Sequence, residues 1–221
     1  HREVPRLLSS ATNDFAFLES YIENNGSDHR LAIWKGKYLE SQGELEKALG
    51  VYLERGSFLD ATRVYVSIGD LDGAADCVCD AEQLAKEDAL NPGNPVNPKG
   101  TPHNPSNPHN PEHQTLTSAQ AFAACAFHLA RAYEARGVIG DAIVWFGKAG
   151  RCGHATRLAM AHNMDGAVFD LAMKAPAGTA SLVARFFLKR DDPGKAVALF
   201  VRFVPCVGFP KSTLHVLSLS W

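Results

Sequence analysis

Two cysteine–histidine pairs are the strongest candidates for chemistry in this sequence. Cys125 and His128 lie three residues apart, and Cys152 and His154 follow near an expected helix start. A thiolate beside an imidazole is typical of a nucleophile or of part of a zinc site. A small residue buried at a close helix crossing explains Cys125 better, because alanines surround it. A thiol or zinc enzyme is therefore a remote alternative.

The remaining cysteines and the known catalytic motifs give no catalytic signal. Cys77 and Cys79 are two residues apart, so on a helix their side chains diverge by roughly 200° and cannot share a metal. With Cys206 the total is five, and no CxxC pair is present. The sequence also lacks GxGxxG, Walker A, HExxH and GxSxG motifs. We therefore expect no enzyme activity, no metal, no cofactor and no small-molecule substrate.

Composition excludes several classes of protein. Of the 221 residues, 46% are hydrophobic and the formal net charge is only -2, so the chain can bury a core and has no basic nucleic-acid footprint. No apolar run approaches the roughly 18 residues of a membrane span, and we expect neither nucleic acid nor a direct membrane span. The start at His1, without an initiator Met, leads us to expect a fragment of a longer product.

A repeated pattern organises the chain. A Gly, an acidic residue, a Leu, a second acidic residue and an Ala coincide at a shift of about 26 residues, and the same frame reappears at 136–146 and more loosely at 191–200. The Gly is expected to close one helix in the left-handed conformation, and the Ala to lie where two helices cross. An aromatic residue four positions after the Ala is expected to fill the gap to the neighbouring hairpin. The expected repeat-packing residues are Gly43, Ala48, Tyr52, Gly69, Ala74, Gly137, Ala142, Phe146, Ala196 and Phe200.

The pattern predicts an all-α fold, an α-solenoid of stacked helical hairpins, because such hairpins cannot bury their faces alone. We expect hairpins at about 30–55, 57–86, 119–149, 151–175 and 178–204. The corresponding segments are 1–29, a partial N-terminal helical segment; 30–86, hairpins 1 and 2; 87–118, an insertion; 119–204, hairpins 3 to 5; and 205–221, an irregular tail. In the second hairpin Val78 takes the aromatic position, so we expect thinner packing there.

Two segments interrupt the repeats. Between Asn91 and Pro111 the dipeptide Asn-Pro occurs six times, which predicts an extended, disordered insertion because proline opposes helix formation. After Val204-Pro205 the repeat pattern stops, and we hypothesise that residues 205–221 are a gene-model artefact. Sequencing the transcript across Leu199 to Phe209 would decide this, since a spliced message that encodes the tail contradicts it.

Possible binding residues are harder to assign. Arg63, Arg131, Arg157 and Arg185 could line a groove for a partner. Trp34, Trp145 and the pair Phe186-Phe187 are expected in the core rather than at an interface. The sequence leaves the partner-binding residues unknown.

Several strings resemble a known family. These are Tyr38-Leu39-Glu40-Ser41-Gln42-Gly43-Glu44, and His128-Leu129-Ala130-Arg131 followed by Asp141-Ala142-Ile143 and Ala155-Thr156-Arg157-Leu158. Over residues 30 to 200 the chain resembles the tetratricopeptide-type repeat region of the intraflagellar transport protein 140 family, whose members are subunits of intraflagellar transport complex A. The resemblance implies a non-catalytic, protein-binding scaffold that contacts other complex A subunits.

The resemblance also implies where the protein works. It implies support of retrograde transport, cilium assembly and cargo entry, and a location in the cilium or flagellum at the axoneme and basal body, with a cytoplasmic pool. A coat-like vesicle-trafficking solenoid without a ciliary role is the alternative, because it would share the hairpin pattern.

Overall fold

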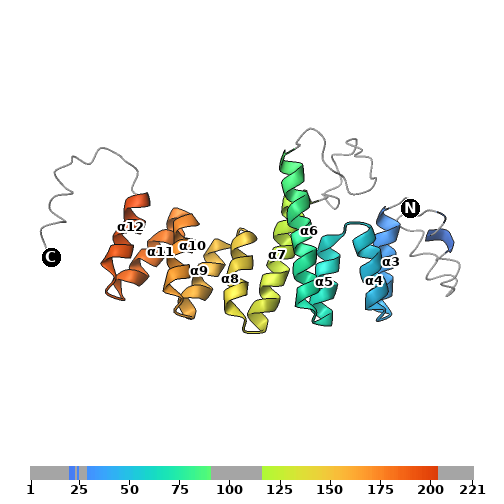
Figure 1. Ribbon diagram of the computed structural model, residues 1–221, viewed down its shortest axis with the longest axis horizontal. Coiled ribbons are helices and arrows are strands. Elements are labelled where there is room, and N and C mark those ends of the chain that lie inside the picture. The colour runs from blue at the N-terminus through green and yellow to red at the C-terminus, as the bar shows by residue number, and fades with distance from the viewer. Residues whose placement is uncertain (1–19, 23, 25–28, 91–115, 204–221) are drawn as a thin grey trace, which may run out of the picture. The chain divides into compact units, whose positions relative to one another are not determined.

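The computed structural model describes residues 20–22, 24, 29–90 and 116–203 (Figure 1). Every regular element in these ranges is a helix, which confirms the all-α prediction. The chain divides into two compact units, His1–Ala149 and Gly150–Trp221. The first unit contains α3 (His29–Ser41), α4 (Leu45–Glu54), α5 (Phe58–Ile68), α6 (Leu71–Leu90), α7 (Ser118–Ala135) and α8 (Ile139–Lys148). The second contains α9 (Cys152–Ala161), α10 (Asp165–Lys174), α11 (Ala177–Leu188) and α12 (Pro193–Phe203).

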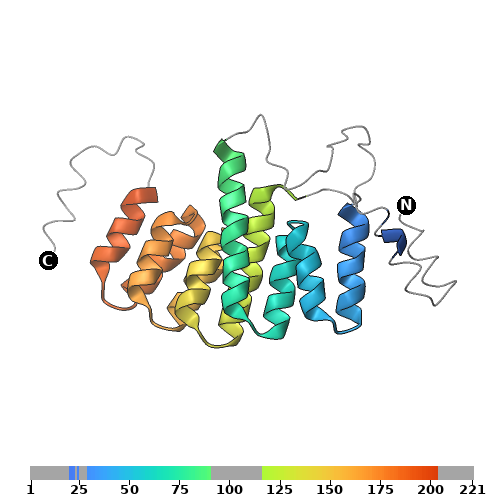
Figure 2. The same ribbon diagram turned by 45° about the vertical axis from the view of Figure 1, so that its right-hand side comes forward.

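The first unit is a stack of antiparallel helical hairpins. Helix α3 packs on α4, α5 contacts both α6 and α7, and α7 packs on α8. One hydrophobic cluster gathers around Tyr52 and Val64, and another joins Val78 and Leu129 across α6 and α7. Figure 2 shows the long helices α6 and α7 side by side. These clusters lie between successive hairpins, so each hairpin depends on its neighbour for part of its core.

The second unit has the same construction. Helices α9 and α10 form one hairpin, and α11 and α12 form the next. Phe187 of α11 is buried, and its ring meets the edge of Phe169 of α10 at 6.2 Å between centroids. An aromatic contact therefore joins these two hairpins.

A shared backbone motif ends the first helix of each hairpin. The residue that reverses the chain has a positive φ, and we call it the turn residue: Gly43, Gly69, Gly137, Asn163 and Asp191. The next amide donates to the carbonyl five residues back, as in Glu44 N to Leu39 O at 2.9 Å and Met164 N to Ala159 O at 3.0 Å. This hydrogen bond is the signature of a Schellman cap. Gly43, Gly69 and Gly137 thus adopt the expected left-handed conformation.

Two turn residues were not expected from the sequence. Asn163 and Asp191 have φ of 57° and 56°, at positions where the repeat pattern relied on glycine. Asn and Asp tolerate the left-handed region better than other residues with a Cβ. The motif therefore continues through the second unit with a different residue type.

The insertion begins later than the sequence predicted. Helix α6 does not stop at residue 86 but runs to Leu90, since no proline interrupts it before Pro92. The Ser118 hydroxyl donates to Asp88 across the two ends of the insertion. Helix α7 then begins with a capping box, in which Thr117 and Gln120 exchange hydrogen bonds. The rest of the predicted insertion, and the tail after residue 204, lie outside the described residues. No described helix is long and apolar enough to span a membrane.

Candidate protein-interaction surface

The turn residue fixes which side chain enters the helix crossing. Five positions after it, the chain places a residue with no exposed surface in every hairpin. These residues are Ala48, Ala74, Ala142, Val168 and Ala196. A small side chain here lets the second helix approach the first closely. The sequence predicted the four alanines for this role but missed Val168, because its turn residue is Asn163.

The residue nine positions after the turn residue is buried in four hairpins and exposed in the last one. Tyr52, Val78, Phe146 and Ala172 occupy this position and are fully buried. Val78 is smaller than the aromatic residues but equally buried. Its exposed fraction therefore gives no sign of the thinner packing that we expected there. Phe200 was expected to pack in the same way, but it is 40% exposed, and this expectation was wrong. No helix in the described residues follows α12 to cover it.

Tyr52 fits against a glycine that the repeat pattern did not reveal. Gly36 lies in the middle of α3, and a Cβ placed on it would stand 2.7 Å from Cζ of Tyr52. Such a contact is too short for any larger residue, so Gly36 makes room for the ring. A glycine within a helix costs stability relative to alanine, and this cost could have indicated a close packing partner.

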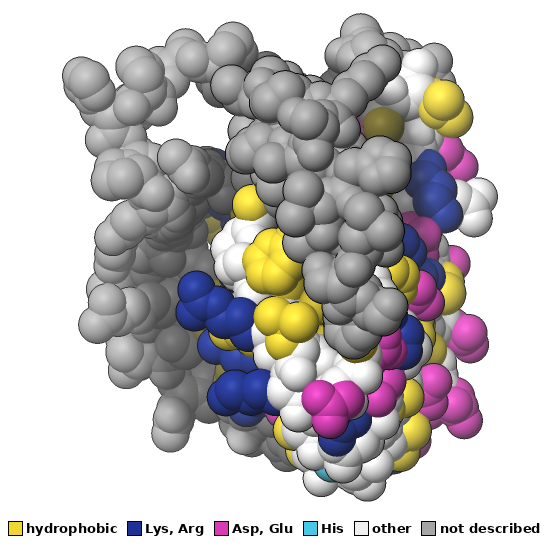
Figure 3. All heavy atoms as spheres, turned by 90° about the vertical axis from the view of Figure 1, so that its left-hand side faces the viewer, with side chains coloured by type: hydrophobic (Ala, Val, Ile, Leu, Met, Phe, Trp, Pro, Cys, Tyr) yellow, Lys and Arg dark blue, Asp and Glu magenta, His cyan; other side chains and the backbone are white. Residues whose placement is uncertain are grey.

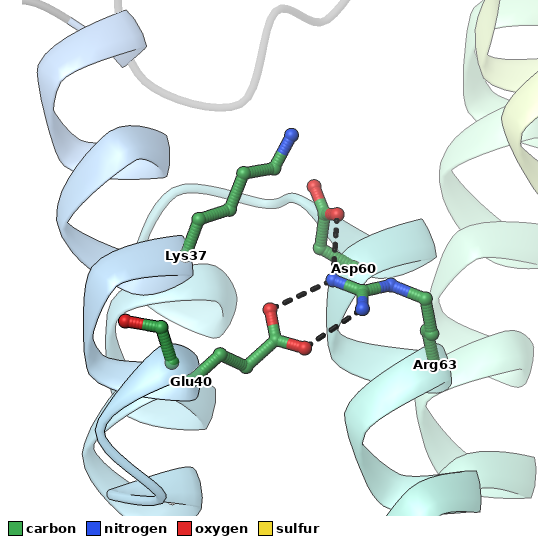
Figure 4. Close-up of a pocket in the computed structure, with 5 residues that line it drawn as sticks. Lys37, Glu40, Asp60 and Arg63 are labelled. Carbon is green, nitrogen blue, oxygen red and sulfur yellow. Dashed lines mark hydrogen bonds and ion pairs between the residues drawn. The ribbon is translucent and has the colours of Figure 1, made fainter.

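A group of charged side chains lies over this contact, in a hollow between α3 and α5 (Figure 4). Arg63 donates two hydrogen bonds of 2.7 Å to the two carboxylate oxygens of Glu40, and a longer one of 3.4 Å to Asp60. The Tyr52 hydroxyl donates to Glu40 at 2.8 Å. Lys37 also lines the hollow. These bonds join three helices, because Glu40 belongs to α3, Tyr52 to α4 and Arg63 to α5.

The electrostatics show that the Glu40 carboxylate is held in its charged form. Burial raises its pKa, but hydrogen bonds from Arg63 and Tyr52 and the charges of Arg63 and Lys37 outweigh burial, and the pKa is lowered. Burial and the hydrogen bond to Glu40 raise the pKa of Tyr52. Both groups are poor proton donors or acceptors near neutral pH in these states. The arrangement favours a structural clamp over acid–base chemistry.

A second set of polar contacts links turn to turn. Arg136 precedes the turn residue Gly137 and donates to the backbone carbonyl of Gly69, the turn residue of the hairpin before it. Arg190 precedes Asp191 and donates to Oδ1 of Asn163, again the preceding turn residue. Arg190 also bonds Asp165 at 2.6 Å. In each unit an arginine at the same repeat position thus holds two hairpin turns together.

The arginines and aromatic residues singled out from the sequence have varied surroundings. Arg63 is engaged as described, and Arg131 pairs with Glu134 on its own helix at 3.0 Å. Arg157 and Arg185 are exposed. Trp34 and Trp145 were expected in the core but are only partly buried: Trp34 stacks on Tyr38, and Lys148 lies over the ring of Trp145. Phe187 is buried and Phe186 partly so.

The cysteines and histidines of the enzyme alternative differ in their surroundings. Cys125 is fully buried, whereas His128 on the same helix is exposed. Burial raises the pKa of the Cys125 thiol to about 12, so the reactive thiolate is scarce at neutral pH. Cys152 and His154 belong to the other compact unit. In the described ranges no three His, Cys, Asp or Glu side chains are placed to hold a metal ion.

Comparison with protein families agrees with this repeat architecture. Over residues 1–88 and 110–204 the chain matches the tetratricopeptide-repeat (TPR) domain of the intraflagellar transport proteins 140 and 172. The chain belongs to this family. The match skips residues 89–109, which hold five of the six Asn-Pro dipeptides, and it stops at residue 204, where the repeat pattern also stops.

Family membership defines the kind of surface that the hairpins offer. It confirms the resemblance seen in the sequence and the α-solenoid of tetratricopeptide-like hairpins. A domain of this type is a protein-binding scaffold related to intraflagellar transport, associated with the cilium and typically non-enzymatic. The interaction surface is therefore to be sought on the faces of the hairpins rather than in a catalytic pocket.

Proposed function

We propose that this chain is a scaffold segment of an intraflagellar transport complex A subunit. It binds other complex A subunits through its helical hairpins, and it supports retrograde transport, cilium assembly and the entry of cargo into the cilium. It acts at the axoneme and basal body and is supplied from a cytoplasmic pool.

The family match carries this proposal, because it covers both compact units of the chain. The hairpin contacts support it. Within each compact unit, Schellman turns close the hairpins, buried alanines lie where their helices cross, and a turn-binding arginine joins one hairpin to the next. A preorganised surface loses less entropy on binding, as a scaffold requires.

Affinity purification tests the proposal. The tagged full-length product is purified from ciliated cells, and the proteins that accompany it are quantified by mass spectrometry. We expect complex A subunits in stoichiometric amounts. Recovery of coat components would favour the vesicle-trafficking alternative, and recovery of other intraflagellar transport subunits without complex A would assign the chain to a paralogous subunit.

A matched pair of variants shows whether the hairpins make the contact. Ala142→Trp forces a large side chain into a fully buried crossing, whereas Ala198→Trp places the same side chain on an exposed position. We expect the first variant to lose complex A subunits and the second to keep them. Equal recovery with both variants would place the contact outside these repeats.

A further inference from the structure

The first helix of each hairpin carries a cation six positions before its turn residue. These cations are Lys37, Arg63, Arg131, Arg157 and Arg185. In the first unit, Arg63 binds Glu40 of the preceding hairpin, and Arg131 binds a carboxylate on its own helix. Arg185 in the second unit is exposed, and its guanidinium forms no ion pair within the described residues. The cation thus recurs along the chain, but its anionic partner does not.

Apolar residues take the places of the carboxylates around Arg185. Counted back from the turn residues, Met160 of α9 occupies the position that Glu40 has in α3. Leu182 of α11, which is 48% exposed, likewise occupies the position of Asp60 in α5. Neither α9 nor α11 contains an acidic residue. Arg185 therefore repeats the cation of the charged group around Glu40 without either of its anions.

Arg157 brings a second cation to the same level of the neighbouring first helix. Arg190 at the end of α11 donates to Asn163 at the end of α9, so the ends of these two helices are joined. Arg157 and Arg185 each lie six residues before the joined turns, which is about 9 Å along a helix. The two cations at these positions in the first unit line one hollow (Figure 4). Arg157 is exposed and, like Arg185, forms no ion pair within the described part of the chain.

The charge of the second unit favours an acidic ligand. Between residues 150 and 203 the sequence has eight Lys and Arg residues against four Asp and no Glu, although the formal charge of the whole chain is -2. Figure 3 looks onto the end of the chain at α11 and α12, where Lys and Arg side chains group beside hydrophobic side chains. A positive field speeds the arrival of an acidic segment and disfavours a basic one or a second copy of the same face.

The first unit shows which anion an arginine at this position accepts. Arg63 holds the Glu40 carboxylate through two hydrogen bonds of 2.7 Å, one to each oxygen. This two-bonded geometry is specific for planar anions such as carboxylates, and Arg185 presents the same group. Met160 and Leu182 add apolar contacts, which suit a peptide that mixes acidic and apolar side chains. Nucleic acid would instead require many phosphate contacts.

We infer that Arg157 and Arg185 form a binding site for an acidic peptide segment of a partner protein. An Asp or Glu side chain of that segment takes the place that Glu40 holds in the first unit, and an apolar side chain beside it contacts Leu182 and Met160. The inference rests on the proposed scaffold function, to which it adds a site and the chemistry of the partner.

Photo-crosslinking in ciliated cells identifies the occupant. The probe is p-benzoylphenylalanine, placed at position 182 of the tagged full-length product. A second product carries it at position 144 as control, because Val144 on α8 is 56% exposed and so resembles Leu182 in exposure. We expect position 182 to crosslink to a segment of another protein in which Asp or Glu adjoins the crosslinked residue. A segment without acidic residues, a phosphorylated segment lost after phosphatase treatment, nucleic acid, lipid, this chain itself, or no excess over position 144 would each overturn the inference.

Variants then test the contribution of each cation. The crosslinked segment is synthesised as a fluorescent peptide, and its Kd for the full chain is measured by anisotropy. We expect Arg185→Gln to weaken binding about tenfold or more, and Arg157→Gln to weaken it less. Lys174→Gln is the matched control, because it removes the same charge from an exposed position of α10. Far-UV circular dichroism verifies that each variant stays folded. Equal Kd values for Arg185→Gln and Lys174→Gln would contradict the site.

Charge exchange separates a direct contact from a general effect of charge. A peptide whose Asp and Glu residues are replaced by Lys should bind the Arg185→Glu chain more tightly than the wild type, whereas the original peptide should show the opposite preference. Failure of this reversal would exclude a direct contact with Arg185. Absence of complex A subunits from the wild-type purification, with these Kd differences intact, would contradict the proposed function and leave the site standing.

Discussion

The hairpins α3–α4 and α11–α12 share a local construction but differ in the fate of one aromatic residue. Each has a turn residue with positive φ, a backbone hydrogen bond that closes the first helix, and a fully buried alanine in the second. Tyr52 in the first hairpin is fully buried, and Phe200 at the same position of the last is 40% exposed. Local sequence therefore builds the hairpin, and the next helix decides how much of it is buried.

Truncating the two aromatic residues should give the largest difference. We expect Tyr52→Ala to lower the free energy of unfolding by about 3 to 5 kcal/mol, because it empties a buried site and removes one of the hydrogen bonds that Glu40 accepts. Phe200→Ala removes a side chain already in contact with water and should cost about 1 kcal/mol or less. Urea unfolding followed by circular dichroism measures both. Similar losses would show that the neighbour of α12 is already in place in the isolated chain.

Overfilling the helix crossing should have the next largest effect. We expect Ala48→Trp and Ala142→Trp to lower stability by roughly 1 to 3 kcal/mol or more, since both alanines are fully buried. Ala198→Trp, on the exposed side of α12, serves as the control. The melting temperature reports the result. If both crossing variants melt like the wild type, the register from turn residue to alanine is incorrect.

The charged clamp over Tyr52 should make the first hairpin sensitive to acid. Because the pKa of Glu40 is lowered in the folded chain, its contribution is complete above the ordinary value of 4.5 and is lost as the pH falls through the folded value. We expect Glu40→Gln to cost about 1 kcal/mol at pH 7 and to flatten the loss of stability below pH 4.5.

Glu54→Gln is the matched control for the clamp, since Glu54 is exposed on the neighbouring helix. Unfolding curves collected between pH 7 and pH 3 measure both variants. A pH profile of Glu40→Gln that parallels the wild type would rule out the clamp as the source of acid sensitivity.

Exchanging the turn residues should give the smallest effect. Gly43 has φ of 80° with nothing near its missing Cβ, so Gly43→Asp should cost about 1 kcal/mol through backbone conformation alone. Asp191→Gly, at φ of 56°, should gain about 0.5 kcal/mol. Thermal unfolding of the two variants and of the double exchange measures this. Opposite signs support one shared turn geometry, and equal signs contradict it.

The sequence predicted those features that repeat along the chain. The spacing between Gly43 and Ala48 recurs at Gly69 and Gly137, so the register of the hairpins could be read without coordinates. The prediction from sequence failed where the turn residue is not a glycine, as at Asn163 and Asp191. Glycine was the signal, whereas the turn requires only a residue that tolerates positive φ.

The charged clamp and the exposure of Phe200 could not be predicted for physical reasons. Glu40 and Arg63 belong to different helices, and nothing in a helical period pairs two surface residues that far apart in the chain. The exposure of Phe200 depends on what packs beyond α12, which is not a property of the hairpin that contains it.

Arg136 and Arg190 restrict the residue types at the positions that they contact in different ways. The acceptor for Arg136 is the backbone carbonyl of Gly69, so this bond needs no particular side chain group at position 69, although a Cβ there would lie 3.1 Å from Nη2 of Arg136. The acceptors for Arg190 are the side chains of Asn163 and Asp165, and replacing either removes a bond. Positions 163, 165 and 190 should therefore covary among members of the family, while the bond between the turns of the first unit requires Arg136 and a residue at position 69 that tolerates a positive φ.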